Sequence, residues 1–446
     1  MIIRRLFSIS NRSFFLKKPQ FDVKRIIEMI PQYQTSIQNR ELIEADSIIR
    51  SLQLLGERYQ NIKEIDKVIA DIQIQRKSIE AQIKKDKTKI TEYSAALKAL
   101  KEQYNDQNSK SSELKKKILE TCKSLPNTLD PTVPLDAPQI EQWINPLKTH
   151  KTSEAQAHVD IMLKKNMLDL QTASNVTGMS WYYLLNDGAR LEQALVAYAL
   201  KKANENGFSS CVPPSITKKE LIDACGFNPR DMNNERQIYA LQDTNLGLVA
   251  TAEIPLAGLG ANKVLELNSG ECSKKLVGVS RCYRAEAGAR GKDTKGLYRV
   301  HEFTKVELFY WSKPETSAKV LEEIKQFQIS VVEELGIPAK VLNMPSNDLG
   351  NPAFKKYDIE AWMPGRGKFG EISSASNCTD FQSRRLNTKY RDDNTGKLEY
   401  VHTLNGTAMA IPRVIVALVE NFYDPSTGKI SVPECLREFM NGQRYI

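Results

Sequence analysis

The feature that most constrains this chain is a long segment, residues 32–125, that contains no proline and a single glycine, Gly56. Proline and glycine interrupt helices more strongly than other residues do, so their scarcity predicts long, continuous helices. Apolar residues between Ile62 and Leu97 recur in steps of three, four and seven, the period of helices that pack as a coiled coil. We therefore predict two helices folded back on each other, with the turn in the polar segment 84–89.

The predicted pair of helices carries an excess of positive charge. Residues 58–123 contain sixteen lysines and arginines against ten aspartates and glutamates. A helix of forty residues is about 60 Å long, so the pair would form a basic rod. Such a rod is either a dimerisation coil with a solvated charged face or a surface for a polyanion. Periodicity alone favours the coil.

A domain boundary is expected after the helices, because four prolines fall within a short segment there: Pro126, Pro131, Pro134 and Pro138. Prolines at this density require an extended, non-helical chain. Beyond about residue 140, short apolar runs alternate with helical stretches and glycine-containing turns. This part exceeds 300 residues, which is enough for a large α+β core.

The first twenty residues form a separate compositional segment. They contain five lysines and arginines and several serines, and the first acidic residue is Asp22. A basic, serine-containing segment without acids is typical of a mitochondrial transit peptide. The alternative is a frayed basic N-terminus without a targeting role.

The overall composition narrows the class of protein. The formal net charge is +9 and the pI is about 9.0, which fits an anionic partner such as RNA without requiring one. The seven cysteines are scattered with no C-x-x-C, and there are four histidines. A disulfide framework, a zinc ribbon and a histidine-rich metal centre are therefore not expected, and a reducing compartment fits best. No apolar run approaches 18 residues, so we expect no transmembrane helix and no membrane partner.

A basic, glycine-rich segment in the second half is a candidate nucleotide site. Residues 277–283 and 301–309 predict two strands of an antiparallel hairpin, and the loop between them contains Arg284, Arg299 and further cations. Arginine pairs bidentately with phosphate, so such a loop suits a polyphosphate. From charge density alone, a solvated loop or an RNA contact is equally compatible.

Three shorter patterns also carry possible chemistry. The run Thr251–Glu253 could bind a ligand, although its residue types equally suit the start of a helix. Glu371 and Ser374 could share a Mg²⁺ ion, or they could mark a strand end with a hydrogen-bonded serine. Residues 403–407 predict a glycine turn entering an apolar helix, near whose start lies Arg413.

Taken together and in order, these patterns resemble the class II seryl-tRNA synthetases over nearly all of the chain after residue 20. The segments that carry the resemblance are GARLEQALVAYAL (188–200), RAEAGARGKDTKGLYRVHEFTKVE (284–307), EISSASNCTDFQSRR (371–385) and TLNGTAMAIPRVIVALVENF (403–422). The resemblance implies an α+β fold in which helices flank a central antiparallel β-sheet. It also implies an N-terminal antiparallel α-helical coiled-coil arm and a homodimer formed through residues 188–200.

The resemblance also implies a function for each part of the chain. Residues 1–20 would be the transit peptide, residues 21–130 a helical arm that binds tRNA, and residues 131–446 the catalytic domain. The expected activity is activation of L-serine by ATP to seryl-adenylate, followed by transfer of serine to the 3′ end of tRNA(Ser). With the transit peptide, the expected location is the mitochondrial matrix. The alternatives are a non-catalytic RNA-binding relative and a ligase that loads a different acceptor.

The family motifs imply roles for individual residues. The expected catalytic residues are Arg284, Glu286 and Arg413. The expected contacts to L-serine are Thr251, Ala252, Glu253, Arg284, Glu307, Asn405 and Thr407. The expected contacts to ATP are Arg284, Ala285, Glu286, Arg299, Val300, Phe303, Glu371, Ile372, Ser373, Ser374 and Arg413. The expected ligands of Mg²⁺ are Glu371 and Ser374.

Overall fold

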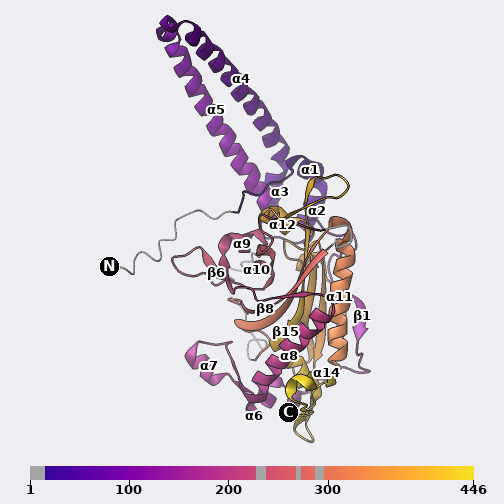
Figure 1. The fold of residues 1–446 in the computed structure, drawn as a ribbon. Coiled ribbons are helices and arrows are strands. Elements are labelled where there is room, and N and C mark those ends of the chain that lie inside the picture. Colours follow the sequence, from indigo (N-terminus) through magenta and orange to yellow (C-terminus); the bar gives the residue numbers. More distant parts are fainter. Residues whose placement is uncertain (1–15, 228–237, 268–272, 287–295) are drawn as a thin grey trace, which may run out of the picture. The chain divides into compact units, whose positions relative to one another are not determined.

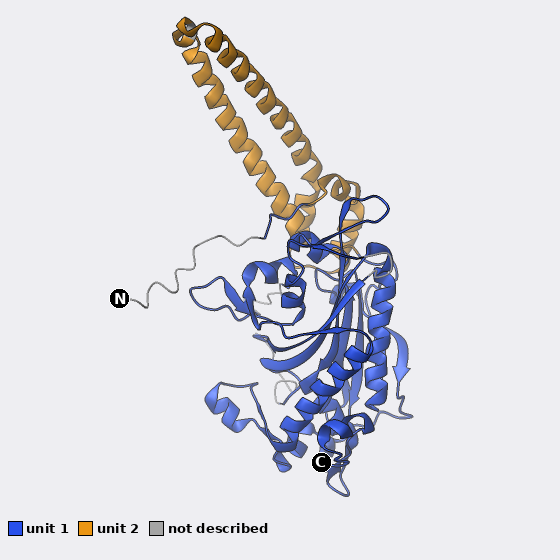
Figure 2. Cartoon of the chain, in the orientation of Figure 1, with its two compact units in different colours: residues 1–20, 129–446 blue, residues 21–128 orange. Residues whose placement is uncertain are grey.

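The structure is a computed structural model that describes residues 16–227, 238–267, 273–286 and 296–446. The chain divides into two compact units (Figure 2): residues 21–128 form one, and residues 1–20 together with 129–446 form the other. Most of the predicted transit peptide and the centre of the predicted basic loop, residues 287–295, lie outside the described residues.

The smaller unit is helical, and two of its helices are long and lie side by side (Figure 1). Its helices are α1 (Val23–Glu28), α2 (Ile30–Asn39), α3 (Ala45–Gln53), α4 (Leu55–Lys85) and α5 (Ile90–Ser124). The predicted turn at residues 84–89 is confirmed, because α4 ends at Lys85 and a 3-10 turn, Lys87–Lys89, precedes α5. Helices α4 and α5 are antiparallel, as the contact between Asp66 and Ser111 shows.

The base of the helical pair has its own hydrophobic core. Buried apolar residues of all the helices of this unit meet there, namely Ile26, Ile37, Leu52, Leu55, Ile62, Ile118, Cys122 and Leu125. Farther along the pair, Ile72 and Leu100 are also buried. Towards the turn the surface is largely polar and charged, with Ile90 half exposed. The apolar stripe therefore stabilises the pair mainly from its base.

The larger unit is built on an eight-stranded sheet in the order β1-β10-β11-β12-β15-β9-β8-β4. These strands are β1 (Gln139–Ile144), β4 (Ser209–Cys211), β8 (Ser273–Tyr283), β9 (Glu302–Ser312), β10 (Ala339–Asn343), β11 (Lys355–Met363), β12 (Lys368–Asn377) and β15 (His402–Ala410). Neighbouring strands are antiparallel, except that β4 runs parallel to β8. The predicted hairpin is confirmed as β8 and β9.

Three helices pack against one face of this sheet: α8 (Asn186–Glu205), α11 (Ser317–Glu334) and α13 (Ile411–Phe422). From the strands, residues such as Val306, Leu308 and Leu404 enter this core. Side chains alternate between the two faces of a strand. The neighbours of these core residues, including Glu307 and Asn405, therefore point to the opposite face.

Smaller elements complete the larger unit. The helices are α6 (His158–Lys164), α7 (Gln171–Val176), α9 (Lys219–Ala224), α10 (Glu253–Gly258), α12 (Phe381–Leu386) and α14 (Glu434–Arg437). The short strands are β2 (Leu168–Asp169), β3 (Tyr183–Leu184), β5 (Ile216–Lys218), β6 (Leu246–Leu248), β7 (Val264–Leu265), β13 (Lys389–Arg391), β14 (Leu398–Tyr400), β16 (Tyr423–Asp424) and β17 (Lys429–Ile430). In the described parts of the chain, every helix is too short or too polar to cross a bilayer.

One local prediction is wrong. Residues 403–407 do not form a glycine turn before a helix, because they lie inside strand β15. Gly406 is needed there for a different reason. A Cβ atom at this position would stand 2.3 Å from Cγ2 of Ile324 on α11. The glycine therefore lets a helix approach the sheet closely.

Candidate active site

The face of the sheet opposite to α8, α11 and α13 presents polar side chains from adjacent strands. Glu307 of β9 lies opposite Thr407 of β15 and opposite Gly278 of β8. Phe303, Lys305 and Glu307 share this face because they are two residues apart on one strand. The predicted ligand residues of β9 and β15 are thus brought to a common surface by strand pairing.

A β-bulge in strand β12 decides how Glu371 and Ser374 are oriented. Ser373 pairs with Ile359 and Glu371 pairs with Glu360, so Ile372 is an extra residue in the ladder. Residues three apart normally point to opposite faces of a strand, but one extra residue reverses this relation. Glu371 and Ser374 consequently lie on the same face. The strand-end interpretation is wrong, because both residues lie within the strand, and the interpretation as shared ligands stays a prediction.

A cavity with about 540 Å³ of empty space, part of it open to solvent, lies on this face. It is lined by Arg284, Glu286, Leu297, Tyr298, Arg299, Val300, Phe303, Lys305, Glu371, Ile372, Ser373, Ser374, Thr407, Ala410, Pro412 and Arg413. These include all of the residues predicted to bind ATP except Ala285, which stands between two lining residues. The lining is rich in arginine and also contains two aromatic rings, those of Tyr298 and Phe303.

Arg413 is held in the cavity wall by three hydrogen bonds. Its Nε donates to the carbonyl oxygen of Tyr298 at 3.2 Å, and its Nη1 donates to the carbonyl oxygen and to Oε2 of Glu371 at 2.9 and 3.1 Å. Burial favours the neutral form of Glu371, but the positive charges of Arg413, Lys356 and Arg284 outweigh it and lower the pKa of Glu371 to about 2. Glu371 is therefore an anion at neutral pH.

The other end of the cavity is formed by the turn that leaves β8. Glu286 adopts a left-handed backbone conformation, with φ of 46°, and its Oε2 lies 3.1 Å from Nε of Arg299. Arg284 packs its guanidinium 5.3 Å from the centre of the Phe303 ring. Within the described residues, the buried Nε of Arg284 has no hydrogen-bond acceptor. A buried donor without an acceptor costs free energy, so an anionic ligand here would stabilise the site.

A second, more deeply buried cluster adjoins the cavity through Lys305. Lys305 forms an ion pair with Glu307 and donates from Nζ to Oγ1 of Thr251 at 2.8 Å. Thr251 in turn donates to Oε2 of Glu307 at 3.2 Å. Lys305 is 6% exposed and Glu307 1% exposed, so both charges are shielded from water. Burial raises the pKa of Glu307, and Lys305 opposes that rise.

Glu253 completes the second cluster at the first turn of α10. Its Oε1 accepts hydrogen bonds from Nδ2 of Asn405 at 2.9 Å and from Nε2 of Gln382 at 2.5 Å. Burial and the nearby charge of Glu307 raise the pKa of Glu253 to about 7. The backbone N–H of Glu253 also donates to Oγ1 of Thr251 at 3.3 Å. Helix α10 begins at Glu253, so the prediction that this run starts a helix is confirmed. Two carboxyl groups in one small pocket can bind a cationic group.

The structure brings the predicted residues together in the cavity and in the adjoining buried cluster. It also places further residues there that were not predicted. Thr251, Ala252, Glu253, Glu307 and Asn405 belong to the buried cluster, and Thr407 lines the cavity beside it. The sequence analysis missed Lys305, although it stands two residues before Glu307 on a predicted strand and must share its face. It also missed Tyr298 and Gln382, which reach the site from a loop and from α12.

Comparisons with known proteins identify the family. Residues 239–422 match the model of the tRNA synthetase class II core domain (G, H, P, S and T). The mitochondrial serine–tRNA ligase of Schizosaccharomyces pombe is 39% identical over 437 residues, covering 93% of this chain and 89% of that protein. The serine–tRNA ligase of Dictyoglomus turgidum is also 39% identical, over 90% of each chain. The structure of seryl-tRNA synthetase from Pyrococcus horikoshii complexed with ATP matches with a TM-score of 0.84 and 33% identity, over 96% of this chain and 99% of that one.

The relatives, the shared antiparallel sheet and the predicted motifs therefore agree, and the chain belongs to the class II seryl-tRNA synthetases, enzymes that ligate serine to tRNA.

Proposed function

We propose that this serine–tRNA ligase serves mitochondrial translation in the matrix, activating L-serine with ATP and charging tRNA(Ser). The mitochondrial serine–tRNA ligase of Schizosaccharomyces pombe among the relatives and the basic, acid-free composition of residues 1–20 support this location. The chemical part of the proposal rests on one observation: an arginine-rich cavity adjoins a buried cluster that contains the carboxyl groups of Glu307 and Glu253. Neither a non-catalytic RNA-binding role nor a different acceptor gains support from the relatives, which are named serine–tRNA ligases.

The arginine-rich cavity is the proposed ATP site. Arg284 would lie between the α-phosphate and the serine carboxylate, where its unpaired Nε could find an anionic acceptor. Glu286 would orient the adenine, and the planar groups of Phe303 and Arg413 would pack against the ring. Arg299 would face the outer phosphates. The serine carboxylate would attack the α-phosphate while pyrophosphate leaves, so the protein chiefly positions and neutralises charge.

The buried acidic cluster is the proposed serine pocket. Glu253 and Thr251 would hold the ammonium group, and Glu307, Asn405 and Thr407 would surround the hydroxyl group. A site built to hydrogen-bond a hydroxyl leaves its own polar groups unpaired when alanine binds instead. Lys305 would keep Glu307 ionised and in place, so that the pocket is arranged before serine enters.

Glu371 and Ser374 are the proposed ligands of Mg²⁺. Both are oxygen donors on one face of β12, and Glu371 is anionic at neutral pH, which suits a hard divalent cation. When bound, the ion would neutralise charge on the phosphates. In this structure Glu371 contacts Arg413. Coordination of the ion by the Glu371 carboxylate would therefore move the two side chains apart.

The remaining proposals concern the partners. The antiparallel pair of α4 and α5 would bind the serine tRNA through its excess of lysine, chiefly by contacts to phosphates. Helix α8, which carries the segment 188–200, would form the interface of a homodimer. The residues 21–130 and 131–446 would thus act as the tRNA-binding and catalytic parts.

The direct test is amino-acid-dependent ATP–pyrophosphate exchange on protein that lacks residues 1–20. We expect exchange with serine and little with threonine, alanine or glycine. Arg284→Ala and Glu286→Ala should each lower the exchange by at least about a hundredfold. Arg284 would neutralise the charge that develops at the α-phosphate, and Glu286 would hold the adenine so that the phosphate is in place. Arg391→Ala, which changes an exposed arginine on β13, is the matched control and should keep full exchange. Full activity of either site variant would show that the ATP site is assigned to the wrong residues.

A further inference from the structure

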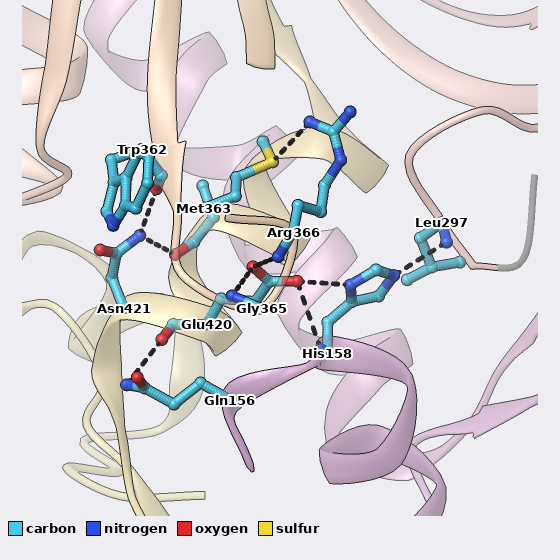
Figure 3. A network of polar contacts seen from close by, with 10 residues as sticks. Gln156, His158, Leu297, Trp362, Met363, Gly365, Arg366, Glu420 and Asn421 are labelled. Atoms are coloured by element: carbon cyan, nitrogen blue, oxygen red, sulfur yellow. Dashed lines mark hydrogen bonds and ion pairs between the residues drawn. The ribbon is translucent and has the colours of Figure 1, made fainter. Parts of the chain in front are cut away.

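A buried pair of a histidine and a carboxylate lies next to the wall of the nucleotide cavity (Figure 3). His158 is the first residue of α6, and Glu420 lies on α13, 262 positions later in the chain. The Nδ1 atom of His158 is 2.7 Å from Oε1 of Glu420. Glu420 is fully buried and His158 is 7% exposed. Removing one member of such a buried pair leaves the other without its partner, which is costly.

The second nitrogen of the histidine ring reaches the cavity wall. The backbone N–H of Leu297 donates to Nε2 of His158 at 3.2 Å. Because a backbone N–H can only donate, Nε2 must be the unprotonated acceptor. The proton of the neutral ring is therefore on Nδ1 and is donated to Glu420. The backbone of Leu297 and the carboxylate of Glu420 together determine the tautomer.

The second oxygen of the carboxylate reaches the same wall by another route. Oε2 of Glu420 accepts hydrogen bonds from the backbone N–H groups of Gly365 and Arg366, at 2.8 and 3.3 Å. The guanidinium of Arg366 in turn lies 3.4 Å from the centre of the Tyr298 ring. The buried carboxylate of Glu420 is thus connected to two consecutive residues of the cavity wall. It is connected to Leu297 through His158 and to Tyr298 through Arg366.

These two wall residues support the side chain that we place against the adenine. Leu297 and Tyr298 line the cavity, and the carbonyl oxygen of Tyr298 accepts the Nε–H of Arg413. Their approach to the histidine depends on Gly296, because a Cβ atom there would lie 2.3 Å from Nε2 of His158. The glycine that precedes this wall is therefore needed for close packing against His158.

We propose that His158, held by Glu420, is a positioning residue for the ATP site: it fixes the backbone of Leu297 and Tyr298 so that Arg413 keeps its orientation. The proposal rests on the ATP site proposed above and deepens it. His158 does not reach the cavity itself, because Leu297 stands between them. Loss of its contact to Leu297 should weaken ATP binding and leave the serine pocket, which lies on other strands and helices, unchanged.

Two substitutions of His158 distinguish the contact made by Nδ1 from the contact made by Nε2. In His158→Asn, the side-chain amide can replace Nδ1 as donor to Glu420, but it is too short to reach Leu297. In His158→Gln, the side-chain oxygen can replace Nε2 and accept the N–H of Leu297. We expect the asparagine variant to raise the KM for ATP about three- to tenfold, the value of one lost hydrogen bond, with the KM for serine within about twofold. The glutamine variant should keep the KM for ATP close to that of the unchanged enzyme.

The experiment is pyrophosphate exchange with ATP and serine varied in turn, on protein whose thermal unfolding shows that it is folded. His150→Asn is the matched control, because the ring of His150 packs among Trp143, Trp362 and Phe369. Arg366→Ala provides a second variant that leaves the buried pair intact. It removes the stack on Tyr298, and we expect it to raise the KM for ATP alone.

Arg413→Ala is measured in parallel so that the two proposals can be told apart. An unchanged KM for ATP in Arg413→Ala would overturn the ATP site itself. If Arg413→Ala raises that KM while folded His158→Asn and Arg366→Ala leave it unchanged, the positioning role is wrong and the ATP site stands. An equal rise of both KM values in His158→Asn would likewise overturn the positioning role, because it would indicate a general structural defect.

Discussion

The two carboxyl groups of the buried pocket are stabilised in different ways. Glu307 has the ammonium group of Lys305 beside it, whereas Glu253 accepts hydrogen bonds from the neutral amides of Asn405 and Gln382. Burial and the charge of Glu307 consequently raise the pKa of Glu253 to about 7. A carboxyl group with a raised pKa is neutral below that pH and anionic above it. Glu253 therefore changes its charge near neutral pH.

We predict that the KM for serine rises as the pH falls through about 7, because the neutral acid attracts the serine ammonium group less. The rise should approach about tenfold per pH unit, as expected for one linked proton. Glu253→Gln should raise the KM for serine and remove most of this dependence. The measurement is pyrophosphate exchange with serine varied, between roughly pH 6 and pH 8, with the KM for ATP as an internal control. A KM for serine that stays level in the unchanged enzyme would contradict the role of Glu253.

At the scale of elements, the site depends on irregularities in otherwise regular strands. The bulge at Ile372 turns Glu371 and Ser374 to one face, and Gly406 lets α11 pack closely against β15. Thr407 and Met409 flank a second irregularity, where the register of β15 against β9 shifts by one residue. Bulges are common beside active sites because they redirect side chains without ending a strand.

Gly406→Ala is predicted to destabilise the larger unit by about 1–3 kcal/mol, because the added methyl group would overlap the side chain of Ile324. The double variant Gly406→Ala with Ile324→Ala should recover part of that loss, although Ile324→Ala alone leaves a cavity and destabilises the protein. Thermal unfolding of the four proteins measures the coupling. Purely additive effects of the two substitutions would contradict the close approach of α11 to this strand.

At the scale of the whole molecule, the helical pair and the sheet unit each have a hydrophobic core of their own. The base of the pair is stabilised by a cluster that includes Leu55, Ile62 and Ile118. On the side of this cluster that is nearer the turn, Asp66 of α4 accepts hydrogen bonds from Ser111 and Lys115 of α5. The pair can therefore be shortened beyond that contact without removing its core.

We predict that replacing residues 68–109 by a short glycine-containing loop leaves serine-dependent pyrophosphate exchange within about twofold. The same change should lower kcat/KM for tRNA charging by at least about a hundredfold, because contacts to several phosphates are lost. It should also flatten the dependence of charging on salt concentration. Lys84→Ala with Lys85→Ala, at the turn, is a milder variant that should weaken charging alone. Equal loss of exchange and charging in the shortened protein would contradict the tRNA-binding role of the pair.

Much of this architecture could be predicted from the sequence because the relevant signals are local. The absence of proline, the scarcity of glycine and the apolar period predicted α4, α5 and the turn between them. The strand-like segments 277–283 and 301–309 predicted the hairpin of β8 and β9, and the family motifs named eleven of the sixteen residues that line the cavity. The helix and strand signals depend on residues within a few positions of one another. The site residues, in contrast, were named only by the resemblance to the family.

Only the tertiary structure decided how those residues work together. The bulge that aligns Glu371 with Ser374 is defined by pairing with β11, and the reason for Gly406 is a helix about eighty positions earlier in the chain. His158 meets Leu297 and Glu420 across 139 and 262 positions. The charge of Glu253 depends on burial that no neighbour in sequence can provide. Strand parity, close packing and desolvation arise only when distant segments meet. Local patterns were therefore enough to predict the elements and motifs, whereas their geometry and charge depend on the fold.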